Sequence, residues 1–103
     1  MVSIIYTTTG TIDEARKIAQ VLVGEKLAAC VHIIPTIESF YRWKGKIEKA
    51  EECVLLVKTT EKNVERTIHT IKNLHSYELP EILVLPPVGG LKEYLAYVED
   101  ETL

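Results

Sequence analysis

The 103-residue chain is predicted to fold as a single α+β domain, residues 1–103. Segments with apolar residues at helical spacing alternate with segments rich in β-branched residues, and short connections join them. No linker, internal repeat or low-complexity run divides the chain. Residues 28–43 also alternate in polarity over a length far beyond that of an ordinary strand. We therefore expect an antiparallel sheet with one very long strand, covered by helices.

The first half of the chain predicts a strand, a helix and a second, very long strand. Residues 2–7, "VSIIYT", have the β-branched content of a strand. The helix follows in "TIDEARKIAQVLVGEK", where Thr11 and Glu14 fit a capping box and Gly24 is a plausible stop. The period-two pattern then predicts a strand over 28–43. One of its faces is expected to carry Ala29, Val31, Ile33, Pro35, Ile37, Tyr41 and Trp43, and the other His32, Thr36, Glu38 and Arg42. Because proline cannot donate to a sheet ladder, a bulge or bend is expected at Pro35.

The second half predicts the return of this hairpin and three further elements. The dipeptide "KG" at 44–45 turns the chain, and 46–59 forms the second long strand. A helix is expected at about 61–74, a strand at 82–86 and a closing helix in "LKEYLAYVEDETL". The order βαββαβα is that of the split βαβ, or ferredoxin-like, arrangement. To it are added a long protruding β-hairpin and an extra C-terminal helix.

Two of the predicted strands are apolar at every position, namely 53–57 and 82–85. Such strands are buried on both faces of a sheet, which two helices on one face cannot achieve. The third helix and a homo-oligomer are the candidates for covering the second face. We favour the oligomer, because a hairpin over 36–50 would overhang the sheet of one chain and need a neighbour to pair with.

The composition excludes several classes of partner. The chain has 12 basic and 15 acidic residues, a net charge of −3, so neither nucleic acid nor an anionic membrane is an expected partner. No apolar stretch approaches the roughly 20 residues of a membrane span, and the start lacks the pattern of a signal peptide. A cytoplasmic location is therefore expected. There, Cys30 and Cys53 would remain reduced thiols.

Two sets of side chains are candidates for binding chemistry. Cys30 and His32 lie two apart on one strand, so both project from the same face, and thiolate with imidazole suits copper. The alternative is a small buried cysteine without a ligand. The second set is Lys58 together with the turn residues His75, Tyr77 and Glu78. It predicts either a ligand or metal site or a structural network in which His75 satisfies a backbone carbonyl.

The predicted turn at 75–81 also suggests a division of roles. In extended backbone, His75 and Tyr77 share one side and Glu78 points to the other. We expect His75 and Tyr77 to face a cleft between subunits that also receives Lys58, and Glu78 to order the turn. In the long hairpin, Tyr41 and Trp43 are expected to anchor a subunit interface or to stack on a ligand.

Five segments in order, "LAACVHIIP", "YRWKGKIE", "ECVLLVKT", "LHSYELPEI" and "LPPVGGLKEYLAYV", resemble the CutA family of divalent-cation tolerance proteins. The resemblance implies a small cytoplasmic protein of ferredoxin-like fold. It also implies a compact homotrimer assembled through extended hairpins, similar to the trimeric nitrogen-regulatory signal transducers. Members are associated with tolerance to copper and other divalent metals and are described as binding copper. The matching residues here are Cys30, Tyr41, Trp43, Lys58, His75, Tyr77 and Glu78.

The chain departs from the family pattern at four positions. Ser76 stands where proline is usual, His32 where asparagine is common, Gly10 near a usual proline, and Tyr97 where tryptophan is frequent. The serine loosens the turn that aims His75.

Three classes of function therefore compete. The first is a copper-binding or other divalent-cation tolerance protein, with His75, Cys30 and His32 as metal ligands. The second is a trimeric sensor that binds a small anionic molecule between subunits, using Lys58 beside Tyr77, Glu78, Tyr41 and Trp43. The third is an enzyme with His75 and Glu78 in acid-base roles. It is not expected, because no nucleophile with an adjacent base is visible.

Overall fold

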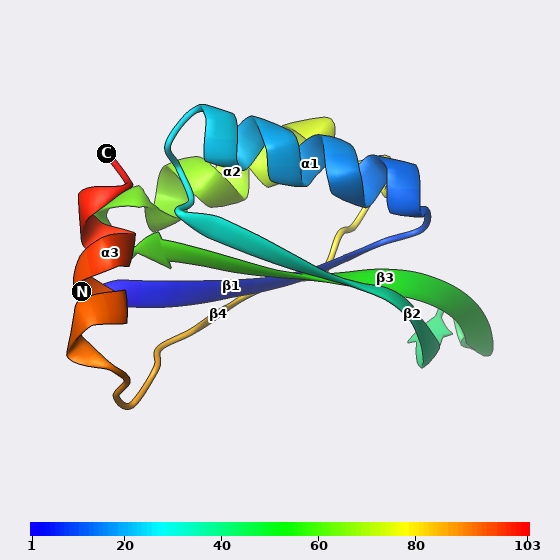
Figure 1. Cartoon of the computed structure of the whole chain (residues 1–103). Coiled ribbons are helices and arrows are strands. Elements are labelled where there is room, and N and C mark those ends of the chain that lie inside the picture. Colours follow the sequence, from blue (N-terminus) through cyan, green and yellow to red (C-terminus); the bar gives the residue numbers. More distant parts are fainter.

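Four antiparallel strands and three α-helices make up the computed structural model, which describes residues 1–103 (Figure 1). The sheet has the strand order β2-β3-β1-β4. The strands are β1 (Val2–Thr9), β2 (Cys30–Trp43), β3 (Lys46–Thr60) and β4 (Ile82–Leu85). The helices are α1 (Ile12–Gly24), α2 (Val64–Leu74), which follows a 3-10 turn at Glu61–Asn63, and α3 (Lys92–Asp100). The ferredoxin-like prediction, with its long hairpin and extra helix, is confirmed. None of the helices is long and apolar enough to cross a membrane.

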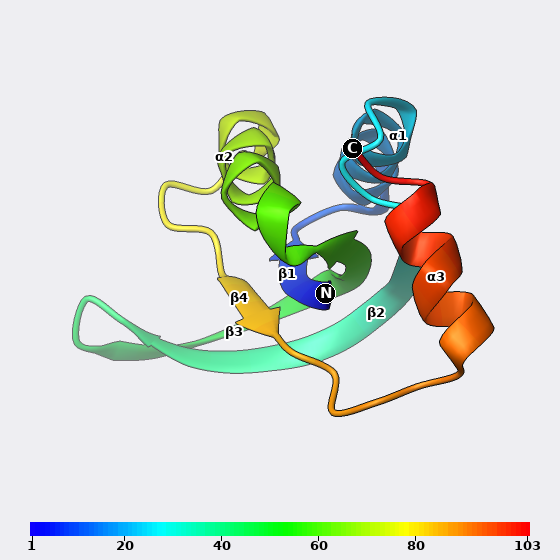
Figure 2. The same cartoon turned by 90° about the vertical axis from the view of Figure 1, so that its left-hand side faces the viewer.

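The main core lies between one face of the sheet and two helices. Helices α1 and α2 run side by side over that face, as Figure 2 shows. From the sheet, Ile5, Leu55 and Val57 pack against Leu22 of α1 and Ile71 of α2, and all five are fully buried. Each such side chain contributes about 1.5 to 3 kcal/mol by leaving water. This burial fixes the sheet and both helices as one body.

The third helix covers only one end of the sheet. Val98 and Leu95 of α3 pack on Val2 and Ala29, at the end where β1 begins. Away from this end, the face opposite α1 and α2 is not covered by a helix (Figures 1 and 2). We call this the open face; on the two central strands it carries Ile4, Tyr6, Thr8, Glu52, Val54, Leu56 and Lys58.

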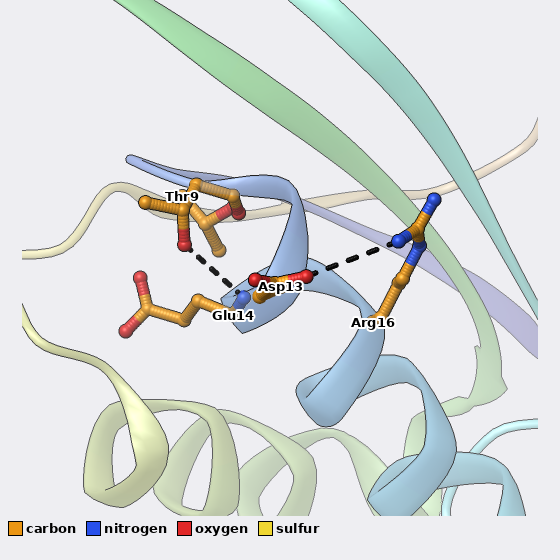
Figure 3. Close-up of polar contacts among 5 residues, drawn as sticks. Thr9, Asp13, Glu14 and Arg16 are labelled. Atoms are coloured by element: carbon orange, nitrogen blue, oxygen red, sulfur yellow. Dashed lines mark hydrogen bonds and ion pairs between the residues drawn. The ribbon is translucent and has the colours of Figure 1, made fainter.

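Helix α1 begins at the predicted cap, but its capping box is not closed. Thr11 Oγ1 accepts a hydrogen bond of 3.2 Å from the Glu14 amide, and Asp13 pairs with Arg16 at 3.8 Å (Figure 3). The Glu14 carboxylate, which the box would return to Thr11, instead accepts from the amide of Ser76 at 2.7 Å and from its hydroxyl at 3.1 Å. One end of α1 is thereby tied to the turn that follows α2.

A bulge in β2 reverses which face its side chains occupy. The pairing of Ile34 with Val54 is followed by that of Ile37 with Glu52, so two residues of β2 oppose Cys53 alone. The predicted bulge at Pro35 is therefore confirmed. The prediction that one face continues through it is wrong, because an extra residue moves all later side chains to the other face. Before the bulge Val31 and Ile33 face the helices; after it the open face carries Ile37, Ser39, Tyr41 and Trp43.

The hairpin extends well beyond the rest of the sheet. Strand β1 ends with Thr9 opposite Cys53, so residues 46–52 of β3 pair with β2 and have no neighbour on their other side. The turn places Lys44 (φ 51°) and Gly45 (φ 81°) both in the left-handed region, as the tightest hairpin turns require. This projection makes the molecule elongated, at 44 × 26 × 22 Å.

The single chain buries one of the two wholly apolar strand segments and leaves the other partly exposed. In β3, Leu55 and Val57 are fully buried. In β4, by contrast, Leu83, Val84 and Leu85 are 51%, 40% and 45% exposed. Strand β4 is also an edge strand, with β1 as its only neighbour. A row of exposed apolar side chains on a free edge is a surface that proteins normally cover.

Two glycines offer a matched test of the hairpin turn. Neither Gly45 nor Gly24 has an atom within 4 Å of the position that a Cβ would take, but only Gly45 has a positive φ. We expect Gly45→Ala to lower the free energy of unfolding by about 1 kcal/mol through strain. Gly24→Ala, in a helix, is expected to raise it by about 0.5 kcal/mol. Urea unfolding at matched protein concentration measures both changes, and equal shifts of the same sign would contradict the turn geometry.

Candidate functional site

Cys30, His32 and Lys58 meet on the open face near α3. Lys58 Nζ donates to His32 Nδ1 at 2.5 Å and lies 3.9 Å from Cys30 Sγ. The register explains the grouping, because Lys58 pairs directly with Cys30, and His32 follows two residues later on the same face. Cys30 and Lys58 are half-buried and His32 is exposed. The predicted pairing of Cys30 with His32 on one face is therefore present, and Lys58 lies between them.

Tyr94 of α3 completes this group. Burial raises the pKa of Tyr94, and the charge of Cys30 and a hydrogen bond to it raise that pKa further. The neighbouring Tyr97 donates to the Ala29 carbonyl at 3.4 Å and so fixes this part of α3 against the start of β2. The other cysteine, Cys53, is buried in the core and donates its S–H to the Pro35 carbonyl. Of the two thiols, Cys30 is thus the one that lies beside polar side chains, those of Lys58 and Tyr94.

One chain supplies two metal-ligating side chains at this point. No group of three or more His, Cys, Asp or Glu in the chain is placed to hold a metal ion. A metal at Cys30 and His32 would take its remaining ligands from solvent or from a second chain. Two-ligand sites of thiolate and imidazole fit soft ions such as copper better than ions that demand a cage of oxygens.

His75 has a structural role in the turn after α2. Its Nε2 donates to the Thr8 carbonyl at 2.6 Å, and its Nδ1 accepts from the Tyr77 amide at 3.1 Å. A carbonyl can only accept and an amide N–H can only donate, so the proton is on Nε2 and the lone pair of Nδ1 is used. While these bonds persist, His75 has no free lone pair for a metal ion. Of the two alternatives given by the sequence, the structure therefore shows the one in which His75 satisfies a backbone carbonyl.

The turn is ordered by residues other than the one expected. Glu14 of α1 accepts both hydrogen bonds from Ser76, and His75 binds the strand β1 and the following amide. Glu78 is exposed and makes no hydrogen bond or ion pair within the chain. The prediction that Glu78 orders the turn is therefore wrong. The reason is that the turn binds back onto α1 and β1, contacts that local sequence does not reveal.

Tyr77 connects the turn to the hairpin through a carboxylate that the sequence did not single out. The Tyr77 hydroxyl donates to Glu52 Oε2 at 2.9 Å, and the Ser39 hydroxyl donates to Glu52 Oε1 at 2.6 Å. Glu52 is only 9% exposed. Gly10 leaves room for this arrangement, because a Cβ there would lie 3.1 Å from the Tyr77 hydroxyl. The signal in the sequence was the second of two adjacent glutamates, Glu51 and Glu52, next to an apolar strand, and the bulge had to be placed before the face of each could be known.

A cavity of about 750 Å³ lies between the hairpin and the turn. Its walls combine aromatic rings with carboxylates and hold one basic residue. The lining residues are Tyr6, Thr8, Ile37, Glu38, Ser39, Phe40, Tyr41, Arg42, Trp43, Glu52, Tyr77, Glu78, Leu79 and Glu81. Four of the eight predicted site residues, Tyr41, Trp43, Tyr77 and Glu78, are thus brought together here.

The cavity has a negative electrostatic environment. Burial raises the pKa of Tyr77, and the hydrogen bond to Glu52 and the charge of that carboxylate raise it further. Burial also raises the pKa of Tyr6, with added contributions from the charges of Glu81 and Glu52. Lys58 does not line the cavity, and in one chain it belongs to the Cys30 group instead. An anionic ligand is therefore disfavoured at the aromatic residues of this site.

Fold and site together define a small ferredoxin-like protein that presents thiol and imidazole groups on an uncovered sheet face. A family model described as CutA1 divalent ion tolerance protein matches residues 3–101, and the chain belongs to this family. The family is one of divalent-cation tolerance proteins and is not a known enzyme family. The function is thus divalent-cation tolerance, as the resemblance implied.

Relatives from distant organisms support this assignment. A divalent-cation tolerance protein CutA from Archaeoglobus fulgidus is 44% identical over 103 residues, covering 100% of this chain and 99% of its own. A solved structure of the Thermus thermophilus protein superimposes with a TM-score of 0.96 at 41% identity, with 99% of each chain covered. The human protein CutA is 38% identical over 101 residues, 98% of this chain. This chain spans only 56% of the human relative's length, and 54% of that of the Arabidopsis thaliana chloroplastic relative.

The observed contacts predict that Tyr77 matters for stability and Glu78 does not, the reverse of the order expected from the sequence. Tyr77→Phe removes one of two donors to a buried carboxylate, which costs about 1 to 3 kcal/mol. Glu78→Gln changes an exposed side chain without a partner and should alter the free energy of unfolding by less than about 0.5 kcal/mol. Thermal and urea unfolding of the two variants beside the parent measure the ranking. A silent Tyr77→Phe would show that its bond to Glu52 is not stabilising.

Proposed function

We propose that this family member contributes to cation tolerance by binding copper between Cys30 and His32. The observation that supports the proposal is the convergence of the thiol and the imidazole on one cation. Lys58 Nζ lies 2.5 Å from His32 Nδ1 and 3.9 Å from Cys30 Sγ, so both groups already face a single positive charge. A metal ion at that point would satisfy the same two groups as ligands.

Lys58 would have to leave this position when a metal binds. Its ammonium uses the Nδ1 lone pair that a metal ion needs, and two cations would repel each other at this separation. Lys58 therefore lowers the affinity for the metal and keeps the pair of ligands in place in its absence. The open coordination positions are left for solvent or for a second chain, and a thiolate ligand favours Cu(I) over Cu(II).

We propose binding rather than catalysis as the activity. His75, the acid-base candidate of the sequence, uses both ring nitrogens in backbone hydrogen bonds. Glu78, its proposed partner, is exposed and makes no bond to it. A base and an acid that work together need to be within hydrogen-bond reach of a common substrate atom. His75 instead holds the turn in place, and Glu78 lines the cavity.

We propose a homotrimer, and the amount of exposed surface supports an assembly. The single chain has an accessible surface of 6674 Å², whereas a compact monomer of 11.7 kDa has about 5,900 Å². This excess of accessible surface is expected for a chain that has an unpaired hairpin and an apolar edge strand, β4. Pairing the hairpin of one copy with the sheet edge of the next would cover both. The number of three copies comes from the family resemblance.

A cytoplasmic location is also proposed. Both cysteines are free thiols, which suits a reducing compartment. Relatives are named for other compartments, namely a chloroplastic protein in Arabidopsis thaliana and a periplasmic one in Archaeoglobus fulgidus.

Copper titration of three variants tests the metal site. Cys30→Ser and His32→Asn are each expected to weaken copper binding at least about tenfold, equivalent to about 1.4 kcal/mol. Lys58→Met is expected to strengthen it, since the competing ammonium is removed. Affinity should fall as the pH is lowered, because protons compete for the thiolate and the imidazole. Calorimetry with Cu(I), Cu(II) and Zn(II) under anaerobic conditions supplies the measurement.

The matched controls for the copper titration are Cys53→Ser, in the core, and His69→Asn, on the exposed face of α2. His75→Ala is a third comparison, and it should lower stability more than copper affinity. If Cys30→Ser and His32→Asn bind copper like the parent, the site is elsewhere. If only His75→Ala loses copper, the turn rather than β2 holds the metal.

Light scattering tests the assembly. The intact protein is expected to have three times the mass of one chain, and deletion of residues 40–49 to yield monomers or aggregates. The deletion removes most of the projecting hairpin and leaves the core between the sheet, α1 and α2 intact. A monomeric mass for the intact protein at micromolar concentration would rule out the homotrimer.

A further inference from the structure

We propose that helix α3 is a movable cap over Cys30 and that the side chain of Asn63 holds this cap closed. Movement of α3 would regulate how fast copper reaches the pair of Cys30 and His32, and this consequence rests on the copper site proposed above. The cap itself depends neither on that site nor on assembly, because all the contacts that define it lie within one chain.

Helix α3 lies beside the start of β2, where Cys30 is located (Figure 2). Tyr97 donates a hydrogen bond of 3.4 Å to the carbonyl of Ala29, the residue before Cys30. Tyr94 lies nearly one helical turn earlier, with its ring centre 5.7 Å from that of Tyr97. Its hydroxyl is within hydrogen-bond reach of the Cys30 thiol. A helix in this position restricts the approach of a metal ion to the thiol.

The attachment of α3 is separate from the main core. Helices α1 and α2 share one large buried cluster with the sheet, whereas Val98 and Leu95 of α3 belong to a second, smaller cluster with Val2 and Ala29. The connection from β4, residues 86–90, contains two prolines and two glycines and makes no backbone hydrogen bond. An element with a small apolar contact and an unbonded connection opens at a lower free energy than the core. Helix α3 is therefore the element best able to move alone.

The segment after α3 is fastened by one buried side chain. Asn63 precedes α2 at the position of an N-cap, but its side chain makes no capping hydrogen bond. It is only 5% exposed, and its Nδ2 donates at 2.8 Å both to the main-chain oxygen of Leu103 and to Thr60 Oγ1. The Leu103 amide donates to the Lys26 carbonyl at 3.0 Å. Two hydrogen bonds thus tie the segment after α3 to the end of α1 and the beginning of α2, and Asn63 supplies the only side chain in this clasp.

Hydrogen exchange of the intact protein, followed by mass spectrometry, tests the cap without any metal. In the parent, the amides of α3 are expected to exchange at least about tenfold faster than those of α1 and α2. Asn63→Ala removes the donor to Leu103 and should speed exchange in α3 by a further factor of about five, with little change in α1. Deletion of Leu103 removes the same contact and leaves Asn63 in place, so it decides the matter if Asn63→Ala fails to fold. The matched control is Asn73→Ala, an exposed asparagine of α2 that bonds only to His69.

Copper kinetics distinguish a cap from a metal ligand. A cap that opens more often speeds association and dissociation together, so Asn63→Ala and the deletion of Leu103 should each raise both rate constants at least about threefold, with a smaller change in their ratio. Loss of a ligand, as in Cys30→Ser, should instead weaken the affinity. The measurement is anaerobic stopped-flow transfer of Cu(I) from its coloured bicinchoninate complex to the protein, and back to an excess of bicinchoninate.

Three results would overturn the cap. They are exchange in α3 as slow as in α1 and α2, an equal rise in all three helices of Asn63→Ala, and copper rate constants that neither Asn63→Ala nor the deletion of Leu103 changes. The copper site is scored separately. Absence of copper binding by the parent would overturn that site and leave the cap standing on its hydrogen exchange, whereas unchanged exchange and rates in the variants would overturn the cap and leave the copper site standing.

Discussion

One extra residue in β2 determines what the uncovered face of this protein carries. Opposite Cys53 the strand places two residues instead of one, and the Cys53 thiol donates to the Pro35 carbonyl at that point. With a regular ladder, Ile37 and every second residue after it would face the helices, as Val31 and Ile33 do. The bulge sends them to the open face, where Ser39 reaches Glu52. A single local irregularity thus puts the later side chains, such as Ser39, on the same face as Cys30 and His32 instead of on the opposite face.

The turn after α2 is the second element on which the arrangement depends. It is attached at three places that are remote in sequence: Ser76 to Glu14 of α1, His75 to the Thr8 carbonyl of β1, and Tyr77 to Glu52 of β3. Two of the three attachments satisfy acceptors of buried residues, the Thr8 carbonyl and the Glu52 carboxylate. Together they hold the turn against the base of the hairpin, so that the cavity has one wall from each. A turn with serine in place of the usual proline depends on such contacts more than a stiffer one would.

The fold could be predicted from the sequence because its signals are local. Helical spacing in 12–24 and 64–74, the alternation in 28–43 and the dipeptide at 44–45 each reflect the side-chain periodicity of one element. Pro35 also marked the bulge correctly. The consequence of the bulge was not foreseen, since one residue more or less reverses every later side chain. Proline marks where a ladder breaks but does not say how many residues are inserted.

The site was less predictable because its contacts join distant parts of the chain. The grouping of Cys30 with His32 followed from a spacing of two, whereas the position of Lys58 between them required the register of β2 on β3. Glu52 was missed, since a glutamate next to an apolar strand segment is usually a solvent-exposed residue at the end of that segment. The roles of Tyr77 and Glu78 were exchanged for a related reason. Which of two adjacent side chains is buried depends on the part of the chain that packs against them. Here Glu52, at the base of the hairpin, binds Tyr77 and leaves Glu78 exposed.

The two groups on the open face differ in charge and are far enough apart to act independently. Lys58 and Glu52 are six residues apart on β3, which is about 20 Å in an extended strand. The screening length in physiological salt is about 8 Å, so charges that are partly solvated at one end have little effect at the other. The charge of Glu52 therefore neither attracts a metal to Cys30 nor draws Lys58 away from His32. If the two sites prove to be coupled, the link must pass through the packing of the strands or through a neighbouring chain, and not through direct electrostatics.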